Sequence, residues 1–267
     1  MKKIAMIFVA VLIGGYIILC LFFYLFQEKF IFNSRKLAHD YEFASDSEYE
    51  ELYFTMDDGV RLHGLLCKSD SSKGLIFFLH GSGGSIKWYE SKIPDYLKLG
   101  YDIFLIDYRG YGKSEGKYKR EDQIIDDIKQ VYEEIKASYV ESKIIIVGLS
   151  MGTHLAAMLA ANYNPQALVL QGSPVSMLSS GKRVLPFIPV SLLARYKLDT
   201  RPYLPNINNT ILIFHGELDD RTTVENALRL KPLLKPTDKF IILEGEGHND
   251  FANNDQYIKE LKEIIDN

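Results

Sequence analysis

Six short apolar runs of four or five residues alternate with longer amphipathic stretches along the chain. The runs are Leu75–Leu79, Ile103–Ile106, Ile144–Val147, Ala167–Leu170, Ile211–Phe214 and Phe240–Leu243. Such runs are typical of strands buried on both faces of a sheet. The expected helices between and after them are Ile124–Ala137, Met151–Asn162, Val224–Leu234 and Gln256–Ile265. A strand–helix alternation of this kind predicts an α/β fold, with a mainly parallel sheet flanked by helices.

Two further strands are expected before this alternation begins. Glu51–Thr55 and Val60–Cys67 flank Asp57-Asp58-Gly59, a turn signal suited to a β-hairpin. Together with the six runs they predict an eight-stranded sheet.

Length and charge exclude several classes of protein. The chain has 267 residues, 47% of them hydrophobic, which is enough for one or at most two domains with a full core. Its net charge of −4 lacks the basic excess of a nucleic-acid-binding protein. Cys20 and Cys67 cannot make a disulfide framework, and the sequence has no tight His/Cys cluster that would predict a metal site.

The N-terminal segment from Ile4 to Phe26 is 23 residues long and contains no charged residue or histidine. As a helix it would measure roughly 35 Å, enough to cross a hydrocarbon core of ~30 Å. A cleaved signal peptide has a shorter apolar region of about 7–15 residues. We therefore expect a single-pass transmembrane signal anchor at 4–26 after a short tail at 1–3, then a connector at 27–48 and a folded domain at 49–267.

The orientation of this anchor is read from the residues on either side of it. Lys2 and Lys3 precede it, while Lys29, Arg35 and Lys36 follow it, so the positive-inside rule favours neither side. The short tail favours an N-terminus left in the cytoplasm, which would place the folded domain outside the cytoplasm.

The motif Gly148-Leu149-Ser150-Met151-Gly152 lies between an expected strand and an expected helix. This is the G-x-S-x-G pattern in the context of a nucleophile elbow, in which a sharp turn exposes the serine hydroxyl. The glycines leave room for the strand and the helix to pass closely. A chance match of five residues is the alternative, and the strand–helix context argues against it. We predict that Ser150 is a nucleophile.

A serine nucleophile needs a histidine base that is oriented by an acid. In this architecture the chain order is serine, acid, histidine. Of the six histidines His154, His215 and His248 follow Ser150. His154 falls one turn into the helix that begins after the serine, and of the other two only His248 leaves room for an acid after an earlier strand. His248 lies in a glycine-rich loop after Phe240–Leu243, and it is the predicted base. The alternative is an ordinary solvent-exposed loop histidine.

Three acids compete for the orienting position after Ile211–Phe214. They are Glu217, Asp219 and Asp220. Asp219 is the predicted acid because Glu217 falls too early in the turn, and Asp220 is the reserve.

Two backbone N–H groups are needed to stabilise the oxyanion. Met151, directly after the nucleophile, supplies one of them. The second is expected in the glycine-rich segment Leu79–Gly84, with Ser82 as the donor and Gly83 as its neighbour. A phosphate-binding loop is the rival interpretation, but no Lys-Ser/Thr follows the glycines as a Walker motif requires.

From about Glu51 to its end, more than four fifths of its length, the chain resembles the α/β-hydrolase superfamily. It is most similar to membrane-anchored hydrolases of the bud-emergence (Bem-like) type and to α/β-hydrolase-domain depalmitoylases. The motifs that carry the resemblance are His80–Gly84, Asp107–Gly116, Gly148–Gly152, His215–Asp219 and Gly247-His248-Asn249-Asp250.

One departure from the subgroup's pattern is Ser82-Gly83, where Asn-Ala is usual; a backbone donor tolerates this change. The resemblance also implies that His80 is structural and that Asp107–Gly116 orders a loop near the pocket.

The resemblance and the triad imply two-step acyl transfer on an ester or thioester, without a metal or organic cofactor. The expected partners are a small-molecule or lipid-like acyl substrate, or an acylated protein, and a membrane bilayer, but no nucleic acid. A serine peptidase on the same fold and a non-catalytic binding protein are the alternatives.

The expected lid is the 40-residue segment 171–210, in the place where this fold inserts one. It is apolar from Met177 to Leu193, and Pro186 and Pro189 interrupt it. Either it covers an acyl-binding pocket near the bilayer, or its side chains simply cover the sheet.

Overall fold

The computed structural model describes residues 1–44, 48–249 and 251–265. Asp250, the last residue of one motif quoted above, lies outside the described residues. The centre of the structure is an eight-stranded sheet with the order β10-β9-β8-β7-β4-β6-β3-β2. Its strands are β2 (Tyr49–Thr55), β3 (Arg61–Cys67), β4 (Leu75–Leu79), β6 (Asp102–Asp107), β7 (Ile144–Leu149), β8 (Ala167–Gln171), β9 (Thr210–Gly216) and β10 (Lys239–Leu243).

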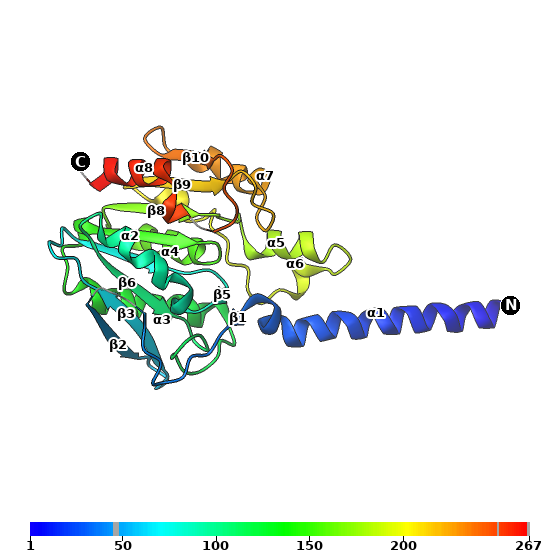
Figure 1. Cartoon of the computed structure of the whole chain (residues 1–267). Helices are drawn as coiled ribbons and strands as arrows, with labels where there is room; N and C mark the ends of the chain where they lie inside the picture. Colours follow the sequence, from blue (N-terminus) through cyan, green and yellow to red (C-terminus); the bar gives the residue numbers. More distant parts are fainter. Residues whose placement is uncertain (45–47, 250, 266–267) are drawn as a thin grey trace.

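The six strands from β10 to β6 are parallel, and β3 and β2 join them in antiparallel pairing. β4, β7 and β8 are buried along their whole length because helices cover both faces of the sheet (Figure 1). This arrangement confirms the predicted α/β fold and its eight-stranded, mainly parallel sheet.

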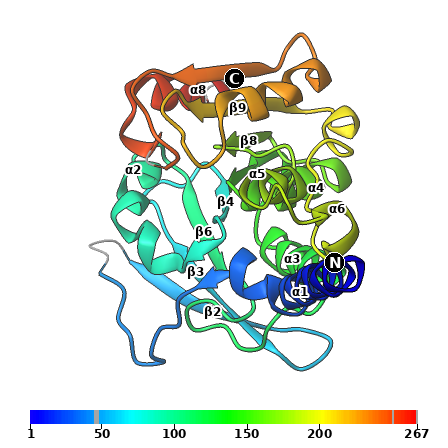
Figure 2. The ribbon, with the colours of Figure 1, turned by 90° about the vertical axis from the view of Figure 1, so that its right-hand side faces the viewer.

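The helices divide between the two faces of the sheet (Figure 2). One apolar core includes residues of α3 and α4, and the other includes residues of α2 and α8. The helices of the domain are α2 (Ile93–Leu97), α3 (Glu121–Lys136), α4 (Gly152–Asn162), α5 (Met177–Val184), α6 (Val190–Leu193), α7 (Val224–Ala227) and α8 (Asp255–Ile265). Short 3₁₀ helices cover Ile86–Lys92, Glu141–Lys143, Leu204–Asn206, Leu228–Leu233 and Phe251–Asn253.

The helix expected at Val224–Leu234 is shorter than predicted. The α-helical part, α7, ends at Ala227, and a 3₁₀ helix that contains Pro232 follows it. Proline has no N–H and its ring clashes with the preceding turn, so a regular α-helix does not continue through this position.

The N-terminal helix α1 (Lys2–Ile31) projects away from the domain (Figure 1). Its 30 residues correspond to a length of about 45 Å. The helix is long and apolar enough to cross a membrane, and its apolar window is not buried inside the protein. A core helix would be covered by the domain, so this helix is a candidate membrane anchor.

Residues predicted as a connector after position 26 pack closely on the domain. Residues 27–31 continue α1, and β1 (Asn33–Ser34) pairs in parallel with β5 (Gly83–Gly84). Phe43 is buried, and its ring stacks on His63. The hydrophobic residues of this segment show neither helical nor strand periodicity, because individual residues contact different parts of the domain surface.

Candidate active site

Ser150 stands in a sharp turn between β7 and α4, with a backbone φ of 52°. A non-glycine residue in this region stores on the order of 1–3 kcal/mol of strain. The two motif glycines allow the turn: a Cβ on Gly148 would lie 2.6 Å from the carbonyl oxygen of Gly152, and one on Gly152 would lie 2.1 Å from that of Leu79. The backbone therefore has the form of a nucleophile elbow.

Neighbouring strands hold this turn in place. The N–H of Ser150 donates to the carbonyl oxygen of Gln171 at the end of β8, at 2.8 Å. A Cβ on Gly81 would lie 3.4 Å from the Cβ of Ser150, so the glycine-rich segment after β4 passes directly beside the serine. The serine thus lies at the carboxyl ends of the central strands, where open α/β sheets bind their ligands.

The predicted acid and base are in direct contact. Nδ1 of His248 lies 2.7 Å from Oδ2 of Asp219. The other carboxylate oxygen, Oδ1, accepts the backbone N–H groups of Arg221 and Thr222 at 2.9 and 2.8 Å. Burial on its own would raise the pKa of the Asp219 carboxyl. The hydrogen bond and the charge of His248, together with the N–H of Thr222, outweigh burial, so the pKa of Asp219 lies below its ordinary value. The carboxylate is held ionised and fixed in orientation.

The two competing acids lie elsewhere. Glu217 accepts the N–H of Gly245 at 3.1 Å, and the side chain of Asp220 is exposed. Neither Glu217 nor Asp220 contacts the ring of His248 in the described part of the chain, so the geometry favours Asp219 among the three candidates.

Gly172 links His248 to the elbow. It follows Gln171, whose carbonyl binds Ser150, and it has a φ of 53°. A Cβ at Gly172 would lie 3.3 Å from Cε1 and from Nδ1 of His248. The ring therefore packs against the backbone next to the serine, and the structure brings Ser150, Asp219 and His248 to one edge of the sheet.

A second histidine contacts the same carboxylate. Nε2 of His215 lies 3.3 Å from Oδ2 of Asp219 and 2.7 Å from the carbonyl oxygen of Thr222. Burial lowers the pKa of His215, which favours the neutral ring. The sequence placed His215 at a strand end but gave no reason to expect this contact, since it depends on how the chain turns back through Thr222.

The predicted oxyanion donors come from two segments, Ser82 from the glycine-rich segment after β4 and Met151 from the elbow itself. In the part of the chain that the structure describes, the backbone N–H groups of Ser82 and Met151 have no hydrogen-bond acceptor. The hydroxyl of Tyr111 donates to the carbonyl oxygen of Ser82 at 2.8 Å, and the pairing of β5 with β1 fixes the residues that follow. These contacts orient the Ser82 peptide, so that its N–H remains available to a ligand.

His80 and Arg109, from two other motifs named above, make contacts that stabilise the loops around the site. His80 is fully buried, its Nδ1 lies 2.7 Å from the carbonyl oxygen of Gly81, and burial lowers its pKa. Arg109 binds Asp127 through two hydrogen bonds of 2.6 and 2.7 Å. Among the described residues, no group of three or more His, Cys, Asp or Glu side chains is placed to hold a metal ion.

The elbow, the buried acid–histidine pair and the parallel sheet define the class of protein: a serine hydrolase. The family described as serine aminopeptidase, S33, matches residues 70–202. The chain is 31% identical over 206 residues to human alpha/beta hydrolase domain-containing protein 17B, covering 74% of this chain and 68% of the relative. It is 32% identical over 148 residues to WAV2 of Arabidopsis thaliana, covering 52% and 47%.

Solved structures share the fold. An esterase of Pyrococcus furiosus superposes with a TM-score of 0.71 at 20% identity, covering 88% of this chain and 97% of that one. An esterase of Exiguobacterium antarcticum gives 0.64 at 19% identity, with 82% and 100% covered. The chain belongs to the α/β-hydrolase family, which confirms the resemblance drawn from its motifs.

Proposed function

We propose that this protein is a membrane-anchored hydrolase that cleaves carboxylic ester or thioester bonds through an acyl-enzyme on Ser150. The observation that carries the proposal is the 2.7 Å contact between His248 and Asp219 beside a strained serine elbow. A buried, fixed carboxylate that orients an imidazole next to a half-buried serine turn is the arrangement that activates a hydroxyl.

In the proposed mechanism His248 takes the proton of Ser150 as the serine oxygen attacks the acyl carbonyl. The developing oxyanion accepts the N–H groups of Ser82 and Met151. His248 then protonates the leaving alcohol or thiol, and a water molecule repeats the sequence on the acyl-enzyme. Asp219 keeps the imidazole in one tautomer and stabilises its charged form. Neither half of the reaction calls for a metal or organic cofactor.

The membrane part of the proposal rests on α1. Its length and its exposed apolar surface support a single crossing, and we infer that residues 4–26 form the anchor. Of the two orientations we favour the one with the N-terminus in the cytoplasm and the folded domain outside it. The proposed substrates are small-molecule or lipid-like acyl compounds, or an acylated protein.

Hydrolysis by the purified full-length protein in detergent micelles tests this function. We expect turnover of p-nitrophenyl esters and of an acyl thioester, and a fall of roughly 10⁴–10⁶ in turnover for Ser150→Ala. Unchanged turnover in Ser150→Ala would refute the mechanism. An amino-acid p-nitroanilide is the comparison substrate, because the matching family carries the description of an aminopeptidase. Faster release from the anilide than from the esters would favour the peptidase.

A further inference from the structure

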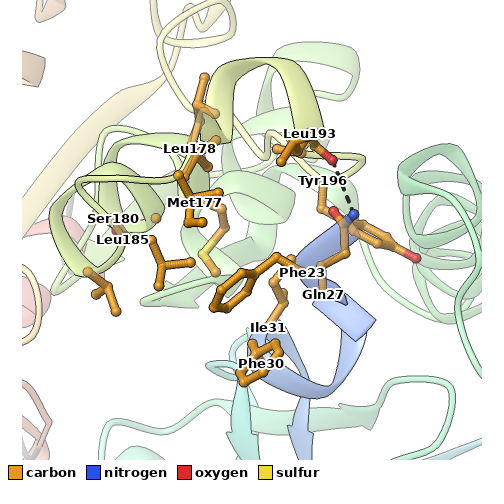
Figure 3. A pocket seen from close by; sticks show the side chains of 15 residues that line it. Phe23, Gln27, Phe30, Ile31, Met177, Leu178, Ser180, Leu185, Leu193 and Tyr196 are labelled. Atoms are coloured by element: carbon orange, nitrogen blue, oxygen red, sulfur yellow. Dashed lines mark hydrogen bonds between the residues drawn. The ribbon is translucent and has the colours of Figure 1, made fainter. Parts of the chain in front are cut away.

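A cavity of about 210 Å³ lies between the C-terminal end of α1 and the lid helices α5 and α6. Phe23, Phe30 and Ile31 line it from α1, and Met177 and Leu185 face them from the lid (Figure 3). Among the residues that line it there is no member of the proposed triad. The cavity is therefore a separate apolar space, and the candidate anchor forms one of its walls.

The amide of Gln27 lies in the cavity wall, and both its ends are hydrogen-bonded. Its Nε2 donates to the carbonyl oxygens of Tyr24 and Leu193 at 2.9 and 3.2 Å, and its Oε1 accepts the N–H of Arg195 at 2.8 Å. Because the polar atoms of Gln27 are already hydrogen-bonded within the protein, a ligand in the cavity would contact mainly hydrocarbon groups. Such a lining selects an apolar ligand.

The anchor and the lid are held together at the base of the cavity. Arg195 pairs with Glu28 at 2.6 Å, and the hydroxyl of Tyr196 donates to the same carboxylate at 3.2 Å. Because these contacts join α1 to the segment after α6, the cavity has a fixed wall on each side.

The tip of the lid lies far along the anchor. The hydroxyl of Tyr16 donates to the carbonyl oxygen of Phe187 at 2.9 Å. Tyr16 stands ten residues before the end of the segment at 4–26, a distance of about 15 Å along a helix. If this segment spans the bilayer as proposed, Phe187 lies at hydrocarbon depth.

The lid tip has the properties of a surface that enters lipid. Residues 184–194 carry no charge, and the side chains of Phe187 and Leu192 are 85% and 84% exposed. Backbone groups at this depth must be paired within the protein. The N–H of Ile188 donates to the carbonyl oxygen of Leu185, the N–H of Leu193 donates to that of Pro189, and Tyr16 binds the carbonyl of Phe187.

We propose that the cavity between α1 and the lid binds the fatty-acyl chain of the substrate, which enters sideways from the bilayer. The proposal rests on the hydrolase function and the membrane anchoring proposed above. Met177 lines the cavity and packs against the core cluster that contains Met151, the residue after Ser150. In this proposal the acyl chain runs from Ser150 along the lid into the cavity, and α1 is both a tether and a wall of the acyl site.

The first test fills the cavity. For the full-length protein in detergent micelles, the ratio of kcat/KM for p-nitrophenyl decanoate to that for p-nitrophenyl acetate is measured. We expect Ser180→Phe and Ala194→Phe, which enlarge two small lining residues, to lower this ratio at least tenfold. The matched control is Val140→Phe, an equally bulky change at an exposed residue outside the cavity, which should keep the parent ratio. An unchanged ratio in both filled variants would overturn the proposal.

The second test measures the depth of the lid tip. Trp88 is the single tryptophan, so a Trp88→Phe background allows one tryptophan to be placed at Phe187 or at Val140. In phosphatidylcholine vesicles brominated at mid-chain, Phe187→Trp should be quenched strongly and Val140→Trp weakly. Equal quenching of the two would contradict entry of the lid into the bilayer.

The two proposals fail in different ways. Acetate turnover that survives Ser150→Ala refutes the proposed function. Turnover that depends on Ser150, together with an unchanged ratio in the filled variants, refutes only the acyl site.

Discussion

Nε2 of His215 lies 3.3 Å from Oδ2 of Asp219, the oxygen that His248 contacts at 2.7 Å. The two histidines share one carboxylate but differ in their surroundings. His215 is fully buried and its second ring contact is a backbone carbonyl, whereas His248 packs beside Gly172 at the elbow. We therefore propose that His248, and not His215, exchanges a proton with Ser150.

The two histidines should therefore respond differently to substitution. We expect His248→Ala to lower turnover by roughly 10⁴ or more, because the general base is lost. His215→Ala should lower turnover by less than about tenfold in protein that remains folded, since this ring only supports the Asp219 loop. Steady-state ester hydrolysis checks both, with circular dichroism as the folding control. The reverse order of effects would make His215 the base.

Asp219→Asn should separate orientation from charge. The amide keeps the shape of the side chain, but it loses the ionised acceptor that His248 and the N–H of Thr222 bind. We expect a fall in turnover of about 10⁴, as for other triads with the wrong imidazole tautomer. Asp220→Asn is the matched control, because that side chain is exposed, and it should keep parent turnover. If Asp220→Asn is the damaging change, the acid has been assigned wrongly.

Buried histidines should make the folded state sensitive to acid. Burial lowers the pKa of His80, His154 and His215 in the folded protein. The unfolded chain binds protons near the ordinary pKa of about 6.5. As the pH falls through that value, the unfolded state takes up protons that the folded state does not, so stability is lost at up to about 1.4 kcal/mol per pH unit for each group.

His154→Phe tests this pH dependence. The substitution keeps a ring next to Tyr203, which packs edge-on against His154 at 5.4 Å, but removes the titrating group. Urea unfolding in detergent should then show a smaller loss of stability between pH 6.5 and pH 5 than in the parent. An identical slope in both proteins would mean that His154 does not contribute.

The anchor can be tested by extraction. Alkaline carbonate should leave the full-length protein in the membrane pellet, because the apolar segment at 4–26 is long enough to span the hydrocarbon. The matched comparison lacks residues 1–26 and should be released. Release of the full-length protein would refute the anchor.

Phe43 tests whether the segment after α1 is part of the folded domain. The side chain is buried against the ring of His63. We expect Phe43→Ala to reduce the free energy of unfolding by about 3–5 kcal/mol, the range for a buried phenylalanine. Urea unfolding measures it, and Phe30→Ala, at an exposed position of α1, is the control. A loss below about 1 kcal/mol would show that residues near 43 fold independently of the domain.

Much of the fold could be predicted from the sequence because buried parallel strands leave a direct pattern. Runs such as Ile144–Val147 are apolar on both faces. The G-x-S-x-G motif is also recognisable from sequence, because a side chain at Gly148 or Gly152 would clash with the neighbouring backbone. Asp219 could be ranked above Glu217 and Asp220 from the turn alone. Its contact with His248 became visible only in three dimensions.

Other features depend on contacts between distant segments. Gln27 and Leu193 are 166 positions apart, and neither shows a local pattern that predicts their hydrogen bond. The cavity beside α1 could not be predicted for the same reason. It forms only where α1 meets the segment from Met177 to Tyr196, and nothing in either apolar segment predicts that the two are in contact. The contact of His215 with Asp219 depends on a turn whose shape the sequence does not specify.

Covalent labelling shows whether Ser150 is the nucleophile. The full-length protein in detergent is treated with a fluorophosphonate, and the modified peptide is identified by mass spectrometry. We expect one adduct, on Ser150, that is absent in Ser150→Ala and forms much more slowly in His248→Ala. Labelling of another residue, or undiminished labelling of Ser150→Ala, would contradict it.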